Sequence, residues 1–167
     1  ELLGPLRAAQ ADPRERGLLT ELVYGLLRLR GRIDFALQQF SRQPLERLET
    51  NALLLLRLGA YQLLELDRIP PHAAVHATVD LSHQVGMGRV TGLVNGTLRT
   101  LIREQDTIKW PTPEDLKAYL QHNCSLPPWL AKELLRQFPN VDSQALAEAF
   151  TKAAPLSLRT NTLKTDR

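Results

Sequence analysis

Hydrophobic residues recur with the period of an α-helix along the first hundred residues of the chain. Over residues 14–29, leucine and valine repeat at alternating spacings of one and three residues, which places them on one face of a helix. A second helix is expected over 33–40, ending before Pro44, because the residue before a proline disfavours helical backbone angles. A third is expected over 45–64. Its residues 52–64 are apolar on most sides, which predicts the most buried helix.

Prolines and glycines divide the next stretch into two further expected helices. Pro71 suits the first position of a helix, where its missing N–H removes no hydrogen bond. This helix is expected to end near Gly86, which forms a turn together with Gly88. Residues 90–102 then carry apolar side chains at the spacing of one helix face, and they predict the most clearly amphipathic helix in the sequence.

The helical pattern lapses over residues 106–113, which we interpret as a linker. Thr112 and Pro113 then read as a cap and a first helical residue. Either Asp142 or Ser143 is expected to cap a later helix. The short helices expected in this part of the chain cover residues 114–121, 127–138 and 143–153.

The composition favours helices that pack on helices. Hydrophobic residues make up 43% of the chain and aromatic residues only 5%, which is typical of leucine-rich helical interiors rather than of β-sandwiches. One stretch differs, because polar and apolar residues alternate over 156–161 as in a strand. A lone strand is not stable, so this strand is expected to belong to a sheet whose other strands lie elsewhere.

The basic residues are the main indication of function that composition supplies. The net charge is +3, and residues 151–167 alone contribute +3, from four basic residues and one acidic residue. Arg28, Arg30 and Arg32 form a second basic group with no acidic residue among them, and Arg14 and Arg16 lie at the other end of the same expected helix.

These arginines have two interpretations, and the composition alone favours neither of them. Guanidinium groups bind phosphate in a bidentate fork, so clustered arginines are typical of contact with an RNA backbone. Cations near the C-terminal end of a helix are also favourable on an ordinary solvated surface, without any ligand.

Other candidate chemistry is weak. His72 and His76 are one helical turn apart and His83 follows, but no cysteine or carboxylate lies beside them to complete a zinc site, so we favour surface or capping histidines. Cys124 is the single cysteine, so no internal disulfide forms. Since no basic residue lies beside it in sequence, we favour a linker role over a nucleophilic one. The two glycines at 86 and 88 lack the Gly-Lys-Ser/Thr of a phosphate-binding loop.

Targeting signals are not evident in the sequence. No apolar stretch approaches the ~20 residues that span a bilayer, and nothing resembles a signal peptide. We therefore expect a cytoplasmic protein with no membrane partner.

Five segments together resemble one known family. They are residues 17–37, 56–81, 91–101, 126–135 and 155–167, and the most specific motifs in them are RIPPHAAV (68–75) and GLVNGTLR (92–99). Their order and spacing cover nearly the whole chain. On these motifs the chain resembles the N-terminal part of the Sun/Fmu (RsmB) family of 16S rRNA cytosine-C5 methyltransferases.

The resemblance implies an all-α, NusB-like helical bundle over residues 1–105 and a linker over 106–113. Residues 114–167 would then begin an α+β RNA-binding linker subdomain, with short helices and a first strand. In the family this region leads into a C-terminal methyltransferase domain that uses S-adenosylmethionine, where one cysteine attacks the cytosine and a second helps to release the product. Cys124 matches neither cysteine, so no catalytic, cofactor-binding or metal-binding residue is carried over to this chain.

The resemblance also indicates where RNA would bind. NusB-like domains use a basic N-terminal face for RNA, and the residues that match it here are Arg14, Arg16, Arg28, Arg30 and Arg32. The expected partners are therefore 16S rRNA and the protein's own methyltransferase domain. Asn95 also matches the family pattern, and we interpret it as structural.

Two other functions share a helical core. A free-standing NusB-type transcription antitermination factor is one, but the segment LPPWLAKELL (126–135) and the strand-like residues after it have no place in such proteins. A helical protein-interaction module without RNA contact is the other, and the arginine group discriminates only weakly against it.

Overall fold

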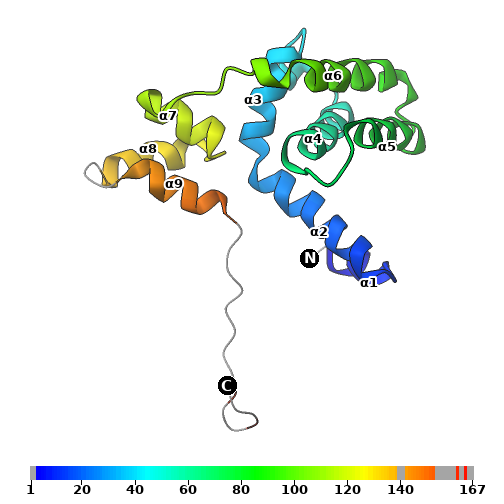
Figure 1. The fold of residues 1–167 in the computed structure, drawn as a ribbon, viewed down its shortest axis with the longest axis horizontal. Coiled ribbons are helices and arrows are strands. Elements are labelled where there is room, and N and C mark those ends of the chain that lie inside the picture. The colour runs from blue at the N-terminus through cyan, green and yellow to red at the C-terminus, as the bar shows by residue number, and fades with distance from the viewer. Residues whose placement is uncertain (1–2, 139–141, 153–160, 162–163, 165–167) are drawn as a thin grey trace.

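The computed structural model describes residues 3–138, 142–152, 161 and 164, and the regular elements in these residues are helical (Figure 1). The first group of helices is α1 (Leu3–Ala9), α2 (Pro13–Arg28), α3 (Arg30–Phe40), α4 (Thr50–Glu65), α5 (Pro71–Gln84) and α6 (Thr91–Glu104). The second group is α7 (Leu116–Ala118), a π-helical turn (Tyr119–Asn123), α8 (Pro128–Gln137) and α9 (Ser143–Thr151). Short 3-10 turns lie at Leu45–Arg47, Gly88–Val90, Gln105–Thr107 and Pro113–Asp115. The expected helical class is thus confirmed in the described residues.

Helix α4 lies at the centre of the first group, as its apolar sequence predicts. Ala52, Leu56 and Ala60 are almost completely buried along it. A β-carbon at Gly59 would collide with the side chain of Leu98, so α4 and α6 approach closely only because this position is glycine. Helix α5 packs against both, and the three helices form most of the larger hydrophobic core.

Helix α2 is joined to α4 by a hydrogen bond that the buried Tyr61 makes. The hydroxyl of Tyr61 donates a 2.6 Å hydrogen bond to Oε1 of Glu21. A β-carbon at Gly25 would overlap that hydroxyl, so glycine is required there for the two helices to meet. Burial and the hydrogen bond to Glu21 raise the pKa of Tyr61, so the phenol stays protonated as a donor.

The second group of helices has a smaller core of its own. Its buried residues are Leu120, Cys124, Leu126, Ala131, Leu134 and Ala147. The hydroxyl of Tyr119 donates a 2.6 Å hydrogen bond to Glu148 on α9, which ties the π-helical turn to the last described helix. That hydrogen bond, together with burial, raises the pKa of Tyr119 to about 12.

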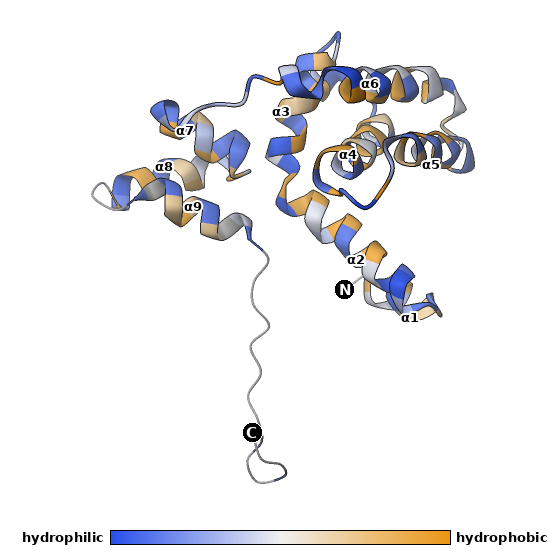
Figure 2. Cartoon of the chain, viewed as in Figure 1, coloured by the Kyte–Doolittle hydropathy of each residue, from blue (hydrophilic) through white to orange (hydrophobic). Residues whose placement is uncertain are grey.

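Helix α3 contacts both groups. It packs against α4 and α6 on one side and against the π-helical turn on the other, and in Figure 1 it stands between the two sets of helices. Ile108 is buried in the larger core and Trp110 packs against it, so part of the predicted linker lies on the first group. Figure 2 shows hydrophobic and hydrophilic residues alternating along α2.

Most predicted helix boundaries are confirmed. Pro71 and Pro128 occupy the first positions of α5 and α8, and Gly86 has the positive φ of +71° that its turn requires. The carboxylate of Asp142 caps α9 by accepting the N–H of Ala145 at 2.9 Å. The predicted strand at 156–161 lies almost wholly outside the described residues.

Two predicted helices and one predicted cap were wrong, and one helix was missed. The single helix expected over 45–64 is broken, because Leu48 and Glu49 have extended backbone between the 3-10 turn and α4. Leu45 is drawn into the core there, and its N–H donates to Oε1 of Gln38 at 3.0 Å. The helix expected over 114–121 is instead a 3-10 turn, the single turn of α7 and a π-helical turn, and its side-chain cap is Asp115 rather than Thr112. Helix α1 was not predicted at all.

Among the described residues, no helix is both long enough and apolar enough to cross a bilayer.

We expect Leu98→Ala to destabilise the first group of helices by about 2–5 kcal/mol, because Leu98 is fully buried and its loss leaves a cavity against α4. The free energy of unfolding is measured by urea titration followed by circular dichroism. Leu93→Ala is the matched control on the same helix, because Leu93 is 41% exposed. Equal losses in the two variants would contradict the assigned core.

Candidate nucleic-acid interface

Helices α2 and α3 are joined by a single residue, which brings their arginines to one turn. Leu29 ends α2 by donating its N–H to the carbonyl of Gly25 at 2.9 Å. Its own carbonyl accepts the N–H of Ile33 at 2.9 Å, in the first turn of α3. Arg28 is therefore the last residue of one helix and Arg30 the first of the next.

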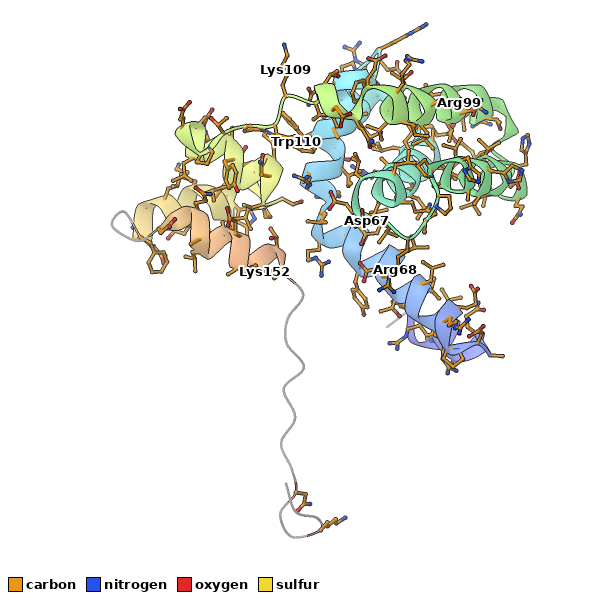
Figure 3. The ribbon with its side chains drawn as sticks, viewed as in Figure 1. Asp67, Arg68, Arg99, Lys109, Trp110 and Lys152 are labelled. Atoms are coloured by element: carbon orange, nitrogen blue, oxygen red, sulfur yellow. The ribbon has the colours of Figure 1, made fainter. Side chains whose placement is uncertain are left out.

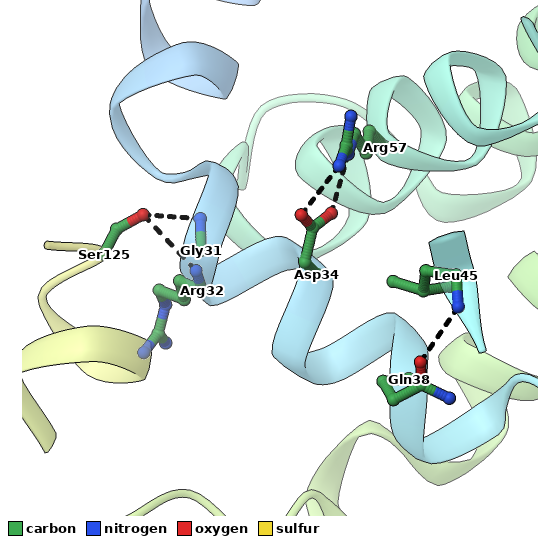
Figure 4. A network of polar contacts seen from close by, with 7 residues as sticks. All are labelled: Gly31, Arg32, Asp34, Gln38, Leu45, Arg57 and Ser125. Atoms are coloured by element: carbon green, nitrogen blue, oxygen red, sulfur yellow. Dashed lines mark hydrogen bonds and ion pairs between the residues drawn. The ribbon is translucent and has the colours of Figure 1, made fainter. Parts of the chain in front are cut away.

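The first turn of α3 is capped by a side chain from the second group of helices. The hydroxyl oxygen of Ser125 accepts the N–H of Gly31 at 2.6 Å and lies 3.4 Å from the N–H of Arg32 (Figure 4). Ser125 has a φ of 57°, in the left-handed region that serine rarely adopts. A β-carbon at Gly31 would lie 3.0 Å from the carbonyl oxygen of Gln121, so glycine allows this close approach.

Arg32 is held by contacts on two sides. Its Nε donates to Oε1 of Glu65 on α4 at 2.8 Å, and its guanidinium lies 4.0 Å from the ring centroid of Trp110. In Figure 3, Trp110 points toward the space between α3 and the second group, whereas the neighbouring Lys109 points away from the ribbon. Arg32 therefore joins α3, α4 and the segment that follows α6, and it is less available to a ligand than its sequence position suggests.

Arg57 is also paired. It donates two hydrogen bonds to the carboxylate of Asp34, of 2.7 and 2.8 Å, in a bidentate arrangement (Figure 4). This pair joins α4 to α3 and leaves Arg57 with little net charge to offer an anion.

A groove of about 730 Å³ runs along α3 between the two groups of helices. One set of lining residues comes from α2, α3 and α4, and it includes Arg28, Arg30, Phe35 and Leu53. The other comes from residues 121–128 of the second group. Within the described part of the chain, neither Arg28 nor Arg30 has an ion pair, and Nε of Arg28 is buried without a hydrogen-bond partner.

Arg14 and Arg16 lie at the opposite end of α2. The helical rise of 1.5 Å per residue places them about 20 Å from Arg28. The N–H of Arg14 donates to the capping carboxylate of Asp12, and the guanidinium of Arg16 donates to the carbonyl of Gln10 at 3.1 Å. The structure thus separates the five predicted arginines into a distal pair, a pair at the groove and the engaged Arg32.

The candidate histidines and Cys124 do not form a common site in the described residues. His76 lies 3.0 Å from Asp80 on the exposed side of α5, so a carboxylate does lie beside one histidine, contrary to the expectation. His83 lies 3.4 Å from the hydroxyl of Thr91. Among the residues that the structure describes, no three histidine, cysteine, aspartate or glutamate side chains come together as metal ligands. Cys124 is buried, and burial raises the pKa of its thiol to about 11.

No pattern in the sequence indicates the second wall of the groove, which residues 121–128 form. Its aromatic contact is between Phe35 and His122, whose ring centroids are 4.4 Å apart. Burial lowers the pKa of His122, so this ring is neutral near pH 7. Gln121 ends the helix expected over 114–121, and His122 and Ser125 fall between expected helices, so only the folding of residues 121–128 against α3 brings them to the arginines.

We expect Arg32→Ala to lower the free energy of unfolding by about 2 kcal/mol, because a charge-assisted hydrogen bond and a cation–π contact are lost together. Arg30→Ala, two residues away and exposed, should change it by less than about 0.5 kcal/mol. Both are measured by urea unfolding followed by tryptophan fluorescence. An Arg32→Ala chain as stable as the parent would show that these contacts contribute no net stability.

We also expect Cys124 to react slowly with iodoacetamide in the folded chain. With its pKa at about 11, only about one thiol in a hundred is ionised at pH 9, and the labelling rate should rise tenfold per pH unit up to that pKa. Mass spectrometry follows the labelling, and the chain in 8 M urea gives the reference for an accessible thiol with an ordinary pKa. Fast labelling of the folded chain at pH 7 would contradict the buried, protonated thiol.

Comparison with known proteins identifies two family matches. Residues 1–103 match the NusB family, and residues 126–167 match the ferredoxin-like domain of RsmF/B-like methyltransferases. Both agree with the resemblance drawn from the sequence motifs.

Among individual proteins, the chain is similar to relatives named for one activity. It is 32% identical, over 93% of its length, to the probable ribosomal RNA small subunit methyltransferase B of Synechocystis sp.. It is also 32% identical, over 97% and 96% of its length, to the proteins of that kind from Bacillus subtilis and Escherichia coli.

The chain spans only about a third of the length of these relatives, with 35%, 36% and 35% of the three covered. The NusB match, by contrast, covers more than half of the chain itself, and the helices that it covers are those of the first group. The chain therefore belongs to the NusB family, and its residues 126–167 match an RsmF/B-like ferredoxin-like domain behind the NusB region.

Proposed function

We propose that this chain is the RNA-docking region of an S-adenosylmethionine-dependent 16S rRNA (cytosine-C5) methyltransferase that acts in the cytoplasm. The observation that carries the proposal is the 32% identity, over nearly the whole chain, to proteins named ribosomal RNA small subunit methyltransferase B. In this proposal the methyl donor and the reacting cysteines belong to a methyltransferase domain, and this chain holds the RNA for it.

The basic residues at the α2–α3 turn support an RNA-binding role. Arg28 and Arg30 lie on consecutive helix ends, and no acidic side chain pairs with either of them in the described residues. Free guanidinium groups bind phosphate oxygens and release counterions, so they supply affinity that does not depend on sequence. Arg14 and Arg16, about 20 Å away along α2, extend the same contact to a longer RNA. We assign Arg32 a structural part in this surface, since Glu65 and Trp110 engage it.

The chemistry of methyl transfer is not assigned to any residue of this chain. A nucleophilic cysteine needs a lowered pKa and access to its target, whereas burial raises the pKa of the Cys124 thiol to about 11. Cys124 instead packs among the apolar residues of the smaller core.

Two other functions remain as alternatives. A free-standing antitermination factor of NusB type would share the first group of helices, but the match of residues 126–167 to a methyltransferase-associated domain favours the methyltransferase. A protein-interaction module would share the bundle too, and it would not depend on the unpaired arginines.

We expect the chain to bind a small-subunit rRNA hairpin with an affinity that falls steeply as salt rises. Arg28→Ala with Arg30→Ala should weaken the binding of all RNA sequences alike and should lower the slope of log K against log salt by about 1–2, since two phosphate contacts are lost. Fluorescence anisotropy with the hairpin and with a scrambled RNA, at several salt concentrations, measures both effects.

The matched control removes two arginines from α6. Arg99 and Arg103 are exposed, lie outside the groove, and carry the same total charge. Their double alanine variant should keep the parental slope within about half a unit. An equal loss in both double variants would indicate a response to net charge alone, and the absence of binding at low salt would contradict an RNA-docking role.

A further inference from the structure

We propose that the groove along α3 holds one unpaired nucleotide of the bound RNA, with its phosphate at Arg28 and Arg30 and its base between α3 and residues 121–128. This inference rests on the proposed RNA-binding function and names the part of the RNA that this site takes. The volume of about 730 Å³ lies in the range of roughly 300–1,000 Å³ that is usual for sites of small organic groups.

The charges in the groove are arranged along its length. At the α2–α3 turn, Arg28 and Arg30 are unpaired in the described residues, and the buried Nε of Arg28 still has a proton to donate. Farther along, Arg57 is neutralised by Asp34, and Glu46 adds a negative charge. An anionic group is therefore attracted to the turn and not to the rest of the groove, which suits a ligand that is charged at one end only.

The rest of the lining suits a flat, uncharged group. Phe35, Leu53 and Leu126 supply apolar surface, and the ring of His122 lies against that of Phe35. Gln121 also lines the groove, and its side-chain amide has no hydrogen-bond partner among the described residues, so this residue has donors and an acceptor to offer the edge of a base. Stacking on apolar and aromatic side chains, with a few polar groups at the base edge, is how proteins read unpaired RNA.

A base-paired segment does not suit this groove. Recognition of double-stranded RNA uses contacts with phosphates and 2′-hydroxyl groups across a wide, shallow surface, whereas here the apolar residues lie between two walls. An apolar peptide would also fit between two walls, but it would leave Arg28 and Arg30 without an anionic partner. The charge complementarity therefore favours a nucleotide.

Because the groove lies between two parts of the protein, a nucleotide bound in it would affect how these parts are arranged. One wall belongs to the NusB region and the other to residues 121–128, which include the first residues of the ferredoxin-like match at 126–167. A nucleotide between them contacts both parts, next to the hydrogen bond from Gly31 to Ser125 that joins them. Bound RNA then fixes the orientation of one region relative to the other.

The test compares Leu27→Glu with Leu54→Glu in the full 167-residue chain. Leu27 lines the groove and is 59% exposed, whereas Leu54 lies on α4 outside the groove and is 49% exposed. The two changes thus add the same charge at similarly exposed leucines, and circular dichroism checks that both chains fold. By fluorescence anisotropy with a labelled single-stranded octanucleotide, Leu27→Glu should weaken binding by about tenfold and Leu54→Glu by less than about twofold.

Two further measurements address the base. An octanucleotide that keeps its phosphates but lacks its bases should bind about tenfold more weakly than the complete strand. Strands that contain 4-thiouridine, irradiated and mapped by mass spectrometry, should cross-link to residues 27–35 or 121–128. Poly-glutamate should compete poorly with the complete strand, because it offers negative charge without a base.

The outcomes separate this inference from the function on which it rests. RNA binding that Leu27→Glu and Leu54→Glu weaken equally, with cross-links only near Arg14 and Arg16, would overturn the groove as the site and leave the RNA-docking function standing. Equal binding of the strand without bases, or full displacement by poly-glutamate, would reduce the groove to a site for anions or acidic peptides. If the parent chain binds no RNA at low salt, both proposals fail.

Discussion

The first turn of α3 is partly buried against the second group of helices, and its backbone amides find a partner there. A helix leaves its first N–H groups without intrahelical acceptors, and burial makes an unpaired N–H costly. Here the acceptor for Gly31 is the hydroxyl of Ser125, which belongs to the second group of helices and lies 94 residues away in sequence. The arrangement of the two groups of helices depends on this contact and on the absence of a side chain at Gly31.

The same constraint explains the unequal environments of neighbouring arginines. Arg32 is the third residue of α3, where it meets Glu65 and Trp110 and stabilises the joint between the groups. Arg30 lies at the exposed start of the helix, and Arg28 ends α2 beside the groove. Three arginines that look equivalent in sequence therefore divide into one structural residue and two that remain available to an anion.

The groove follows from the way in which the two cores meet. Each group of helices buries its own apolar residues, and the main contact between the groups in the described residues is that of α3 with the π-helical turn. The space left beside that contact has apolar residues from both groups and positive charge at one end. Our proposals of RNA docking, and of an unpaired nucleotide in this groove, both place the ligand at the junction that connects the NusB region to the domain that follows it.

The sequence by itself determined the helices that obey local rules and the family to which the chain belongs. Prolines fix the starts of α5 and α8, and the apolar period of residues 90–102 reports a face that α6 buries. Motifs such as GLVNGTLR carry the family resemblance because they are contiguous. Only the tertiary structure decided that the helix expected over 45–64 is interrupted at Leu48, that Ser125 caps α3, and that Arg32 is the engaged arginine. Those features depend on contacts between residues far apart in sequence, which the local pattern of apolar residues does not predict.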